Sequence, residues 1–197
     1  MSLVIKYRKS GITEQELVHR CAQEDALAQK VLFEKYGPGL QGICFRYAKN
    51  LSDAEEIFQL GFIKIFDKLG NFRFESGLKT WMTRIMINTA LNYLKTNEKI
   101  KWESDIESQF ENTDLSTEQL HGMDLKFLME CIQKLPVGYR LVFNMYAIEG
   151  YSHKEIAEEL NITEGTSRSQ YARAKNVLEK KLLAIGFEKN NYAGRRI

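Results

Sequence analysis

The sequence of 197 residues is 44% hydrophobic, 11% aromatic and 27% charged, with a formal net charge of +2. This length allows one large domain or two small ones, and the apolar content is sufficient for packed cores. Because the net charge is so small, any nucleic-acid-binding surface must come from the local distribution of charge. Only two prolines occur and no sustained period-two alternation is present, so the chain is predicted to be all-α.

Several protein classes are disfavoured by what the sequence lacks. Cys21, Cys44 and Cys131 are far apart and show no paired ligand spacing with histidines, which predicts core thiols rather than disulfides or a zinc site. No run of eighteen apolar residues occurs, so neither secretion nor membrane insertion is expected and a cytoplasmic location is predicted. No phosphate loop, zinc-protease motif or nucleophile elbow occurs either, so we predict no enzyme activity, no cofactor and no small-molecule substrate.

The first half of the chain reads as four helices. Thr13 and Glu16 form a capping box for a helix that reaches Tyr36, where Gly37-Pro38-Gly39 is expected to break it before a second helix runs to Tyr47. A third helix is expected to be capped by Ser52 and to carry an apolar stripe, which consists of Phe58, Phe62, Ile65, Phe66 and Leu69.

A loop over residues 70–77 leads into the fourth helix, which is predicted to run from Lys79 to Leu94. In this region Phe74 is expected to belong to the core rather than to a ligand site, and Trp81 is expected to anchor the loop against the helix.

An acidic stretch without periodicity separates the two halves. It contains six carboxylates and no Lys or Arg, namely Glu103, Asp105, Glu107, Glu111, Asp114 and Glu118. Ser116 with Gln119 can cap the next helix, which runs to Pro136, and a short helix over residues 139–149 follows. The predicted organisation is a helical domain over 11–99, a flexible acidic linker over 100–117, a second helical domain over 118–186 and a disordered basic tail over 187–197.

Residues 151–175 read as a helix-turn-helix. Ser152 and Glu155 form a capping box for its first helix, Asn161 suits the left-handed stop, and Thr163 can cap the second helix. On that second helix Tyr171 falls on the apolar face with Ala174 and Leu178. The opposite face carries Ser169, Arg173 and Asn176, with Arg173 at its centre, and it is flanked by Arg168, Ala172 and Lys175. Because this face is poor in acids and small at Ser169 and Ala172, it favours DNA binding over a merely solvated amphipathic hairpin.

Three segments in this order and spacing resemble the extracytoplasmic-function sigma factors, the compact two-domain class of bacterial RNA polymerase initiation subunit. They are residues 53–59 (DAEEIFQ), residues 72–88 (FRFESGLKTWMTRIMIN) and the helix-turn-helix. The resemblance implies a region 2 domain that docks on the β′ clamp helices and melts the minus-ten element. It also implies a region 4 domain that reads the minus-thirty-five element, with core polymerase, including the β flap, and promoter DNA as partners, and an anti-sigma factor as a possible one.

The resemblance also implies site residues. Core polymerase would be bound by Asp53, Glu55, Glu56 and Gln59, of which Asp53, Glu56 and Gln59 share a face at three-residue spacing. Leu60 stands where an acidic residue is common in the family, which lowers the docking charge. The minus-ten element would be captured by Phe72, Ser76 and Asn88 and held along its phosphates by Lys79 and Arg84. The minus-thirty-five element would be read by Arg168, Ser169, Ala172, Arg173 and Lys175, while Ser167 replaces a more common β-branched residue.

Two other classes remain open from the sequence. One is an ordinary helix-turn-helix regulator that never joins polymerase, although the first half shows no ligand-sensing site. The other is a helical adaptor that binds polymerase without reading DNA, against which the basic face of the second helix argues. Copurification with polymerase and specific promoter binding would separate these classes.

Overall fold

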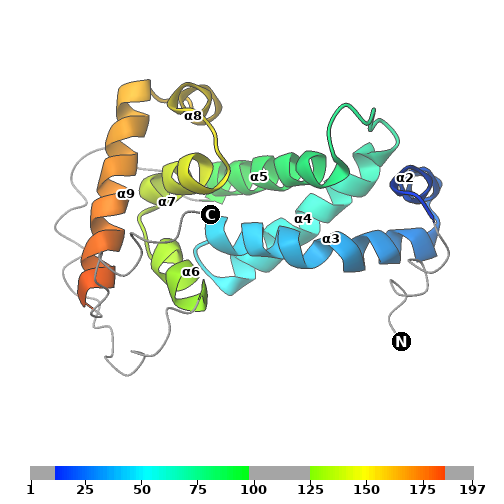
Figure 1. The fold of residues 1–197 in the computed structure, drawn as a ribbon, viewed down its shortest axis with the longest axis horizontal. Coiled ribbons are helices and arrows are strands. Elements are labelled where there is room, and N and C mark those ends of the chain that lie inside the picture. Colours follow the sequence, from blue (N-terminus) through cyan, green and yellow to red (C-terminus); the bar gives the residue numbers. More distant parts are fainter. Residues whose placement is uncertain (1–11, 98–124, 185–197) are drawn as a thin grey trace, which may run out of the picture. The chain divides into compact units, whose positions relative to one another are not determined.

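The computed structural model describes residues 12–97 and 125–184, and the chain divides after Lys99 into two compact units. The described residues are helical in both units and contain no strand, which confirms the all-α prediction (Figure 1). The predicted acidic linker, the cap at Ser116 and the basic tail lie outside the described residues.

The described part of the N-terminal unit contains α2 (Glu14–Ala22), α3 (Ala26–Tyr47), α4 (Leu51–Leu69) and α5 (Leu78–Asn97). Helices α3, α4 and α5 pack against one another, and α2 packs on α3 and α4. Side chains with at most 1% exposure fill the space between them, among them Leu32, Tyr47, Ile57, Ile65, Met82, Met86 and Leu91. Glycine at position 61 permits the close approach of α4 and α5, because a Cβ there would lie 2.3 Å from Sδ of Met86.

The first predicted break is wrong in its position. Thr13 does cap α2, but that helix ends at Ala22, and Glu24 takes a left-handed φ of 60°. Asp25 then caps α3 by accepting hydrogen bonds from the backbone N–H groups of Leu27 (2.9 Å) and Ala28 (3.1 Å). The sequence analysis did not predict that Asp25 begins a helix.

Helix α3 continues through Gly37-Pro38-Gly39 instead of ending there. A proline inside a helix removes one backbone hydrogen bond and crowds the preceding turn, at a cost of roughly 3 kcal/mol. Here buried side chains lie on both sides of the proline, with Leu32 before it and Leu40 and Cys44 after it. Packing of the whole helix against α4 and α5 offsets the local preference for a break.

The start of α4 also differs from the prediction by two residues. Its cap is Asn50, whose side chain accepts from the backbone N–H of Asp53 at 2.8 Å, and not Ser52. Both residue types are good caps, so the sequence alone did not distinguish them. The three cysteines are buried, as predicted, and burial raises the pKa of Cys44 to about 12, which makes it unreactive.

Residues 125–184 of the C-terminal unit form α6 (Leu125–Gln133), α7 (Val137–Phe143), a π-helical turn η3 (Asn144–Ile148), α8 (His153–Leu160) and α9 (Glu164–Ala184). Its apolar cluster joins α6, α7 and α9 through Cys131, Ile132, Leu135, Tyr139, Ala174 and Leu178. Arg140 is buried at 2% exposure and donates from Nη1 to the carbonyl oxygens of Gln133 (2.9 Å) and Leu135 (3.2 Å). This arginine therefore satisfies carbonyl groups at the end of α6.

Candidate nucleic-acid interface and docking face

The polar residues at the start of α4 form one side of that helix, which we call the docking face (Asp53, Glu56 and Gln59). Glu56 and Gln59 are exposed, and Asp53 is half-buried at the edge nearest α5. The hydroxyl of Tyr93 on α5 donates to Oδ1 of Asp53 (3.1 Å) and to Oε2 of Glu56 (2.9 Å). Glu55 is also exposed; it lies about 100° from Glu56 around the helix but one turn before Gln59, so it borders the docking face on the side of Gln59.

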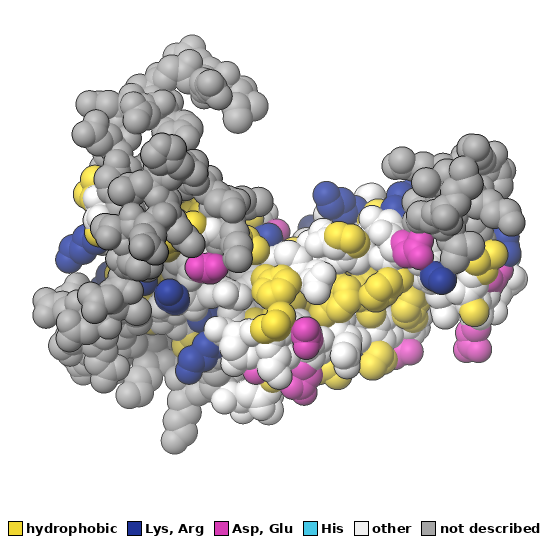
Figure 2. All heavy atoms as spheres, turned by 90° about the horizontal axis from the view of Figure 1, so that it is seen from below, with side chains coloured by type: hydrophobic (Ala, Val, Ile, Leu, Met, Phe, Trp, Pro, Cys, Tyr) yellow, Lys and Arg dark blue, Asp and Glu magenta, His cyan; other side chains and the backbone are white. Residues whose placement is uncertain are grey.

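Two large apolar side chains continue the docking face along α4. Leu60 is 38% exposed and Ile63 is 57% exposed, and both follow Glu56 and Gln59 at helical spacing. Phe33 on α3 is also exposed and lies against Phe58 and Phe62. Figure 2 shows apolar side chains gathered on a face of the N-terminal unit. The structure thus adds an apolar component to a surface that the sequence had indicated only by charge.

The loop before α5 holds an aromatic group in which the predicted roles are exchanged. Phe74, expected in the core, is 42% exposed and has a left-handed φ of 58°. Phe72, expected to contact DNA, is only 8% exposed. The centroid of its ring lies 4.6 Å from the ring centroid of Phe74 and 5.0 Å from that of Trp81. Trp81 therefore anchors the loop as predicted, while Phe74 presents the more accessible ring.

Of the residues predicted to contact the minus-ten element, α5 places Arg84 and Asn88 on one face and Lys79 on the opposite side. Trp81, Arg84 and Asn88 lie on the solvent side of the helix, since residues spaced by three, four and seven share a face. The aromatic group around Phe72 lies at one end of this face, and Ser76 is exposed in the same loop. Lys79 is exposed in the first turn but lies about 180° from Asn88 around the helix.

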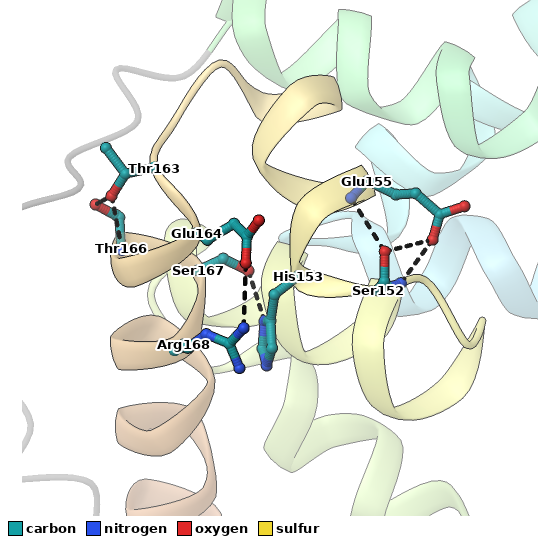
Figure 3. A network of polar contacts seen from close by, with 8 residues as sticks. All are labelled: Ser152, His153, Glu155, Thr163, Glu164, Thr166, Ser167 and Arg168. Carbon is teal, nitrogen blue, oxygen red and sulfur yellow. Dashed lines mark hydrogen bonds and ion pairs between the residues drawn. The ribbon is translucent and has the colours of Figure 1, made fainter.

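The helix-turn-helix has the capping pattern that the sequence predicts (Figure 3). Ser152 accepts from the backbone N–H of Glu155, and the Glu155 carboxylate accepts from the backbone N–H of Ser152, which completes the capping box. Asn161 ends α8 in the left-handed region at φ 56°. Thr163 then accepts from the backbone N–H of Thr166 at 3.0 Å and caps α9.

A buried polar pair joins the two helices of this motif. His153 of α8 is hydrogen-bonded through Nδ1 to Oγ of Ser167 on α9 at 2.9 Å, and Ser167 is fully buried (Figure 3). The imidazole stacks on the ring of Tyr146 with centroids 4.2 Å apart. Burial lowers the pKa of His153, the charge of Arg168 lowers it further, and Glu164 opposes them. The serine that breaks the family pattern is thus matched to a histidine.

The outward face of α9 agrees with the prediction at Ser169 and Asn176 but has Ala172 in place of Arg173 at its centre. Ala172, Ser169 and Asn176 are exposed at its centre, whereas Arg173, expected there, is only partly exposed at one edge. The reason is that Ser167 and Gln170 are buried together with Ala174 and Leu178. The prediction placed the buried face of α9 from its apolar residues alone and left out Ser167 and Gln170. The predicted outward face was therefore turned around the helix axis from the observed one. Tyr171, expected to be buried, is half-exposed.

Basic residues flank this face on the other edge. Arg168 and Lys175 are exposed, and Arg168 Nη2 lies 3.1 Å from Oε2 of Glu164 one turn earlier. Lys175 Nζ lies 5.3 Å from the centroid of the Tyr171 ring. Three small or polar positions with three cations around them leave room for the wall of a DNA groove.

The two units match two successive protein families. Residues 32–100 match the family "Sigma-70 region 2", and residues 128–178 match "Sigma-70, region 4". The ECF RNA polymerase sigma-E factor of Haemophilus influenzae is 31% identical over 182 residues, which cover 87% of this chain and 96% of that protein. The chain belongs to the extracytoplasmic-function sigma factors. This sigma factor is therefore a promoter-specific transcription initiation factor whose partners are core RNA polymerase and promoter DNA.

Further comparisons agree with that membership. The RNA polymerase sigma-H factor of Pseudomonas aeruginosa is 31% identical over 180 residues, covering 86% of this sigma factor and 93% of its relative. A solved structure of the sigma factor RpoE in complex with the anti-sigma factor NepR from Bartonella quintana matches with a TM-score of 0.51 at 20% identity, over 78% of this chain and 96% of that one. That likeness concerns the fold. Among the described residues of this sigma factor, no helix combines the length and apolar character needed to cross a membrane.

Proposed function

We propose that this sigma factor docks on core polymerase through the docking face of α4, captures the minus-ten element with the 70–77 loop and α5, and reads the minus-thirty-five element with α9. Residues 11–99 would form the docking and melting domain and residues 118–186 the upstream-reading domain. Residues 100–117 would be a flexible acidic linker and 187–197 a basic tail. The observation that carries this proposal is the helix-turn-helix, whose caps and buried His153–Ser167 pair fix an exposed, acid-poor face on α9.

The docking proposal combines charge and apolar contact. Asp53 and Glu56 supply carboxylates for basic groups on a partner, Gln59 adds an amide, and Leu60 and Ile63 supply apolar area beside them. Reversing both charges in Asp53→Lys/Glu56→Lys should weaken competition for core polymerase and leave helical content unchanged. The matched control is Glu14→Lys/Glu16→Lys on α2. The control should compete like the wild type. If Asp53→Lys/Glu56→Lys does so as well, α4 is not the docking element.

The melting proposal assigns strand capture to the loop and α5. A captured base interacts only after it leaves the stack, so Asn88→Ala should leave closed-complex binding intact and slow strand opening. Phe72→Ala should do the same but also reduce stability, since Phe72 is buried, whereas the exposed ring of Phe74 is positioned to stack on a base. Permanganate footprinting of holoenzyme on a promoter would report opening. Wild-type opening in both Asn88→Ala and Phe74→Ala would remove this loop from the site.

The upstream-reading proposal separates base contacts from phosphate contacts. A base contact by Arg173 predicts that Arg173→Ala loses about 1–3 kcal/mol on the best upstream element and relaxes preference, while Lys175→Ala weakens all sequences alike and lowers the salt slope by about one. Ala172→Glu, at the centre of the exposed face, should abolish upstream binding. Normal affinity and preference in Ala172→Glu would show that another surface reads the element.

An anti-sigma partner is proposed from the exposed apolar side chains beside the docking face. Phe33 and Ile63 are exposed on α3 and α4, and covering them would also block core docking. Copurification of the tagged sigma factor from its own cells should recover a protein that competes with core polymerase, and Ile63→Asp should reduce its recovery. This sigma factor is proposed to act in the cytoplasm, on the bacterial chromosome.

A further inference from the structure

Tyr93 makes the tertiary contact that reaches both carboxylates of the docking face. It lies on α5, 37 and 40 residues away from Glu56 and Asp53 in the sequence, and its hydroxyl oxygen lies within hydrogen-bond distance of both carboxylates. Asn50 holds Asp53 from the other side, since its Nδ2 donates to Oδ2 at 3.0 Å. The pair is thus placed by α5 and by the helix cap before any partner arrives.

Two like charges one turn apart on a helix repel each other, and an exposed Glu samples many rotamers. A shared hydroxyl donor reduces both effects, because it lies between the carboxylates and favours one rotamer of each. One hydroxyl proton leaves most of the lone pairs on the two carboxylates free to accept from basic groups. Burial and the two carboxylates raise the pKa of Tyr93, so the hydroxyl keeps its proton at physiological pH.

We propose that Tyr93 is a positioning residue for core polymerase docking, whose hydroxyl holds Asp53 and Glu56 in the arrangement that binds basic groups of the polymerase. The inference rests on the proposed docking role of those two carboxylates. Tyr93 lies on the same helix as Arg84 and Asn88, so the same hydroxyl ties the docking face to the helix that carries the proposed minus-ten site.

The chain supplies a matched control in Tyr36. Its hydroxyl also donates to a carboxylate on another helix, Oε2 of Glu14 at 2.5 Å, and the side chain is half-buried like that of Tyr93. Tyr36→Phe and Tyr93→Phe therefore delete the same chemical group and the same kind of hydrogen bond within one domain. Only the second deletion touches the docking face.

The test is displacement of fluorescently labelled wild-type sigma factor from core polymerase by each unlabelled full-length variant. Since ordering a long side chain at an interface costs about 0.5–1.5 kcal/mol, Tyr93→Phe should compete about two- to tenfold less well, and Tyr36→Phe should compete like the wild type. In the background Asp53→Ala/Glu56→Ala, adding Tyr93→Phe should cause no further loss, because the hydroxyl has lost both acceptors. Far-UV circular dichroism should show equal helical content throughout.

The outcomes separate this inference from the docking proposal. If Asp53→Ala/Glu56→Ala competes poorly while Tyr93→Phe competes like the wild type, the carboxylates dock and Tyr93 does not position them. If Tyr93→Phe loses the same factor with and without the two carboxylates, the hydroxyl acts elsewhere, and the inference is overturned. If the carboxylate variant itself competes normally, the docking proposal fails and this inference fails with it.

Discussion

The two units of this sigma factor are stabilised by different kinds of interior. In the described part of the N-terminal unit, Thr89 is the buried polar side chain, and it donates to the carbonyl of Ile85 in its own helix. The described part of the C-terminal unit buries five polar side chains, which are Arg140, Asn144, His153, Ser167 and Gln170. Polar contacts such as the His153–Ser167 pair join helices of this unit, so its arrangement depends on hydrogen bonds as well as on apolar packing.

The comparison predicts that apolar truncation is most costly in the N-terminal unit. Ile57 is fully buried on α4, so Ile57→Ala should lower the free energy of unfolding of that unit by about 2–5 kcal/mol. Ile63→Ala on the same helix is the control, because this side chain is mostly exposed and should change stability by less than about 0.5 kcal/mol. Urea denaturation of the full chain would measure both. Equal effects would mean that α4 is oriented differently.

In the C-terminal unit the sensitive group is the polar pair. Ser167→Ala leaves Nδ1 of His153 buried without a partner and should cost about 1–3 kcal/mol, whereas His153→Phe/Ser167→Ala should recover most of that loss. Ser169→Ala is the matched control on the exposed side of α9. A double variant less stable than Ser167→Ala would contradict the assignment of the loss to an unpaired histidine.

The same histidine should make the C-terminal unit sensitive to mild acid. The pKa of His153 is lowered in the folded state, so the unfolded chain binds the proton more readily. Stability should therefore be constant above about pH 6.5 for this group and fall as the pH decreases below that value towards the lowered pKa. Thermal melts of the full chain between pH 5 and 8 would show it, and His153→Phe should remove the slope. An unchanged slope in that variant would assign the acid sensitivity to other groups.

The smallest predicted effect concerns the ion pair on the recognition helix. Glu164 pairs with Arg168 at an exposed position, so Glu164→Gln frees the guanidinium and removes a negative charge beside the DNA. Binding of nonspecific duplex should strengthen by about two- to fivefold at low salt, and the gain should disappear at high salt. Glu130→Gln on α6 removes the same charge without touching the Glu164–Arg168 pair and should change nothing. Equal gains in both variants would point to net charge instead of the pair.

The sequence predicted helix caps and helix stops correctly where the residues that form them lie close together in the chain. The Ser152–Glu155 box, the left-handed Asn161 and the Thr163 cap are satisfied by backbone groups within four residues, so spacing alone predicts them. The apolar stripes that gave the all-α class depend in the same way on helical periodicity. Errors arose where distant residues decide, as at Pro38, which stays helical because α3 is packed along its length.

The candidate site shows the same division. The exposed positions of Glu56, Asn88 and Arg168 follow from periodicity, and the structure leaves them on outer faces. The buried Ser167 could not be predicted, because its partner His153 lies 14 residues away and only the folded motif brings them together. The contact of Tyr93 with the docking carboxylates, and the exchange of Phe72 with Phe74, likewise depend on how the loop and α5 pack, which no local pattern encodes.

We propose that this sigma factor gives core polymerase its promoter specificity through two DNA-reading surfaces. The most direct measurement is transcription in vitro by purified core polymerase from a genomic promoter pool, with sequencing of the transcript starts. We expect discrete starts that depend on the protein and share two upstream elements. Ala172→Glu should lose the starts that depend on the distal element, and Asp53→Lys/Glu56→Lys should lose all of them. Starts no more frequent or specific than those of core polymerase alone would contradict it.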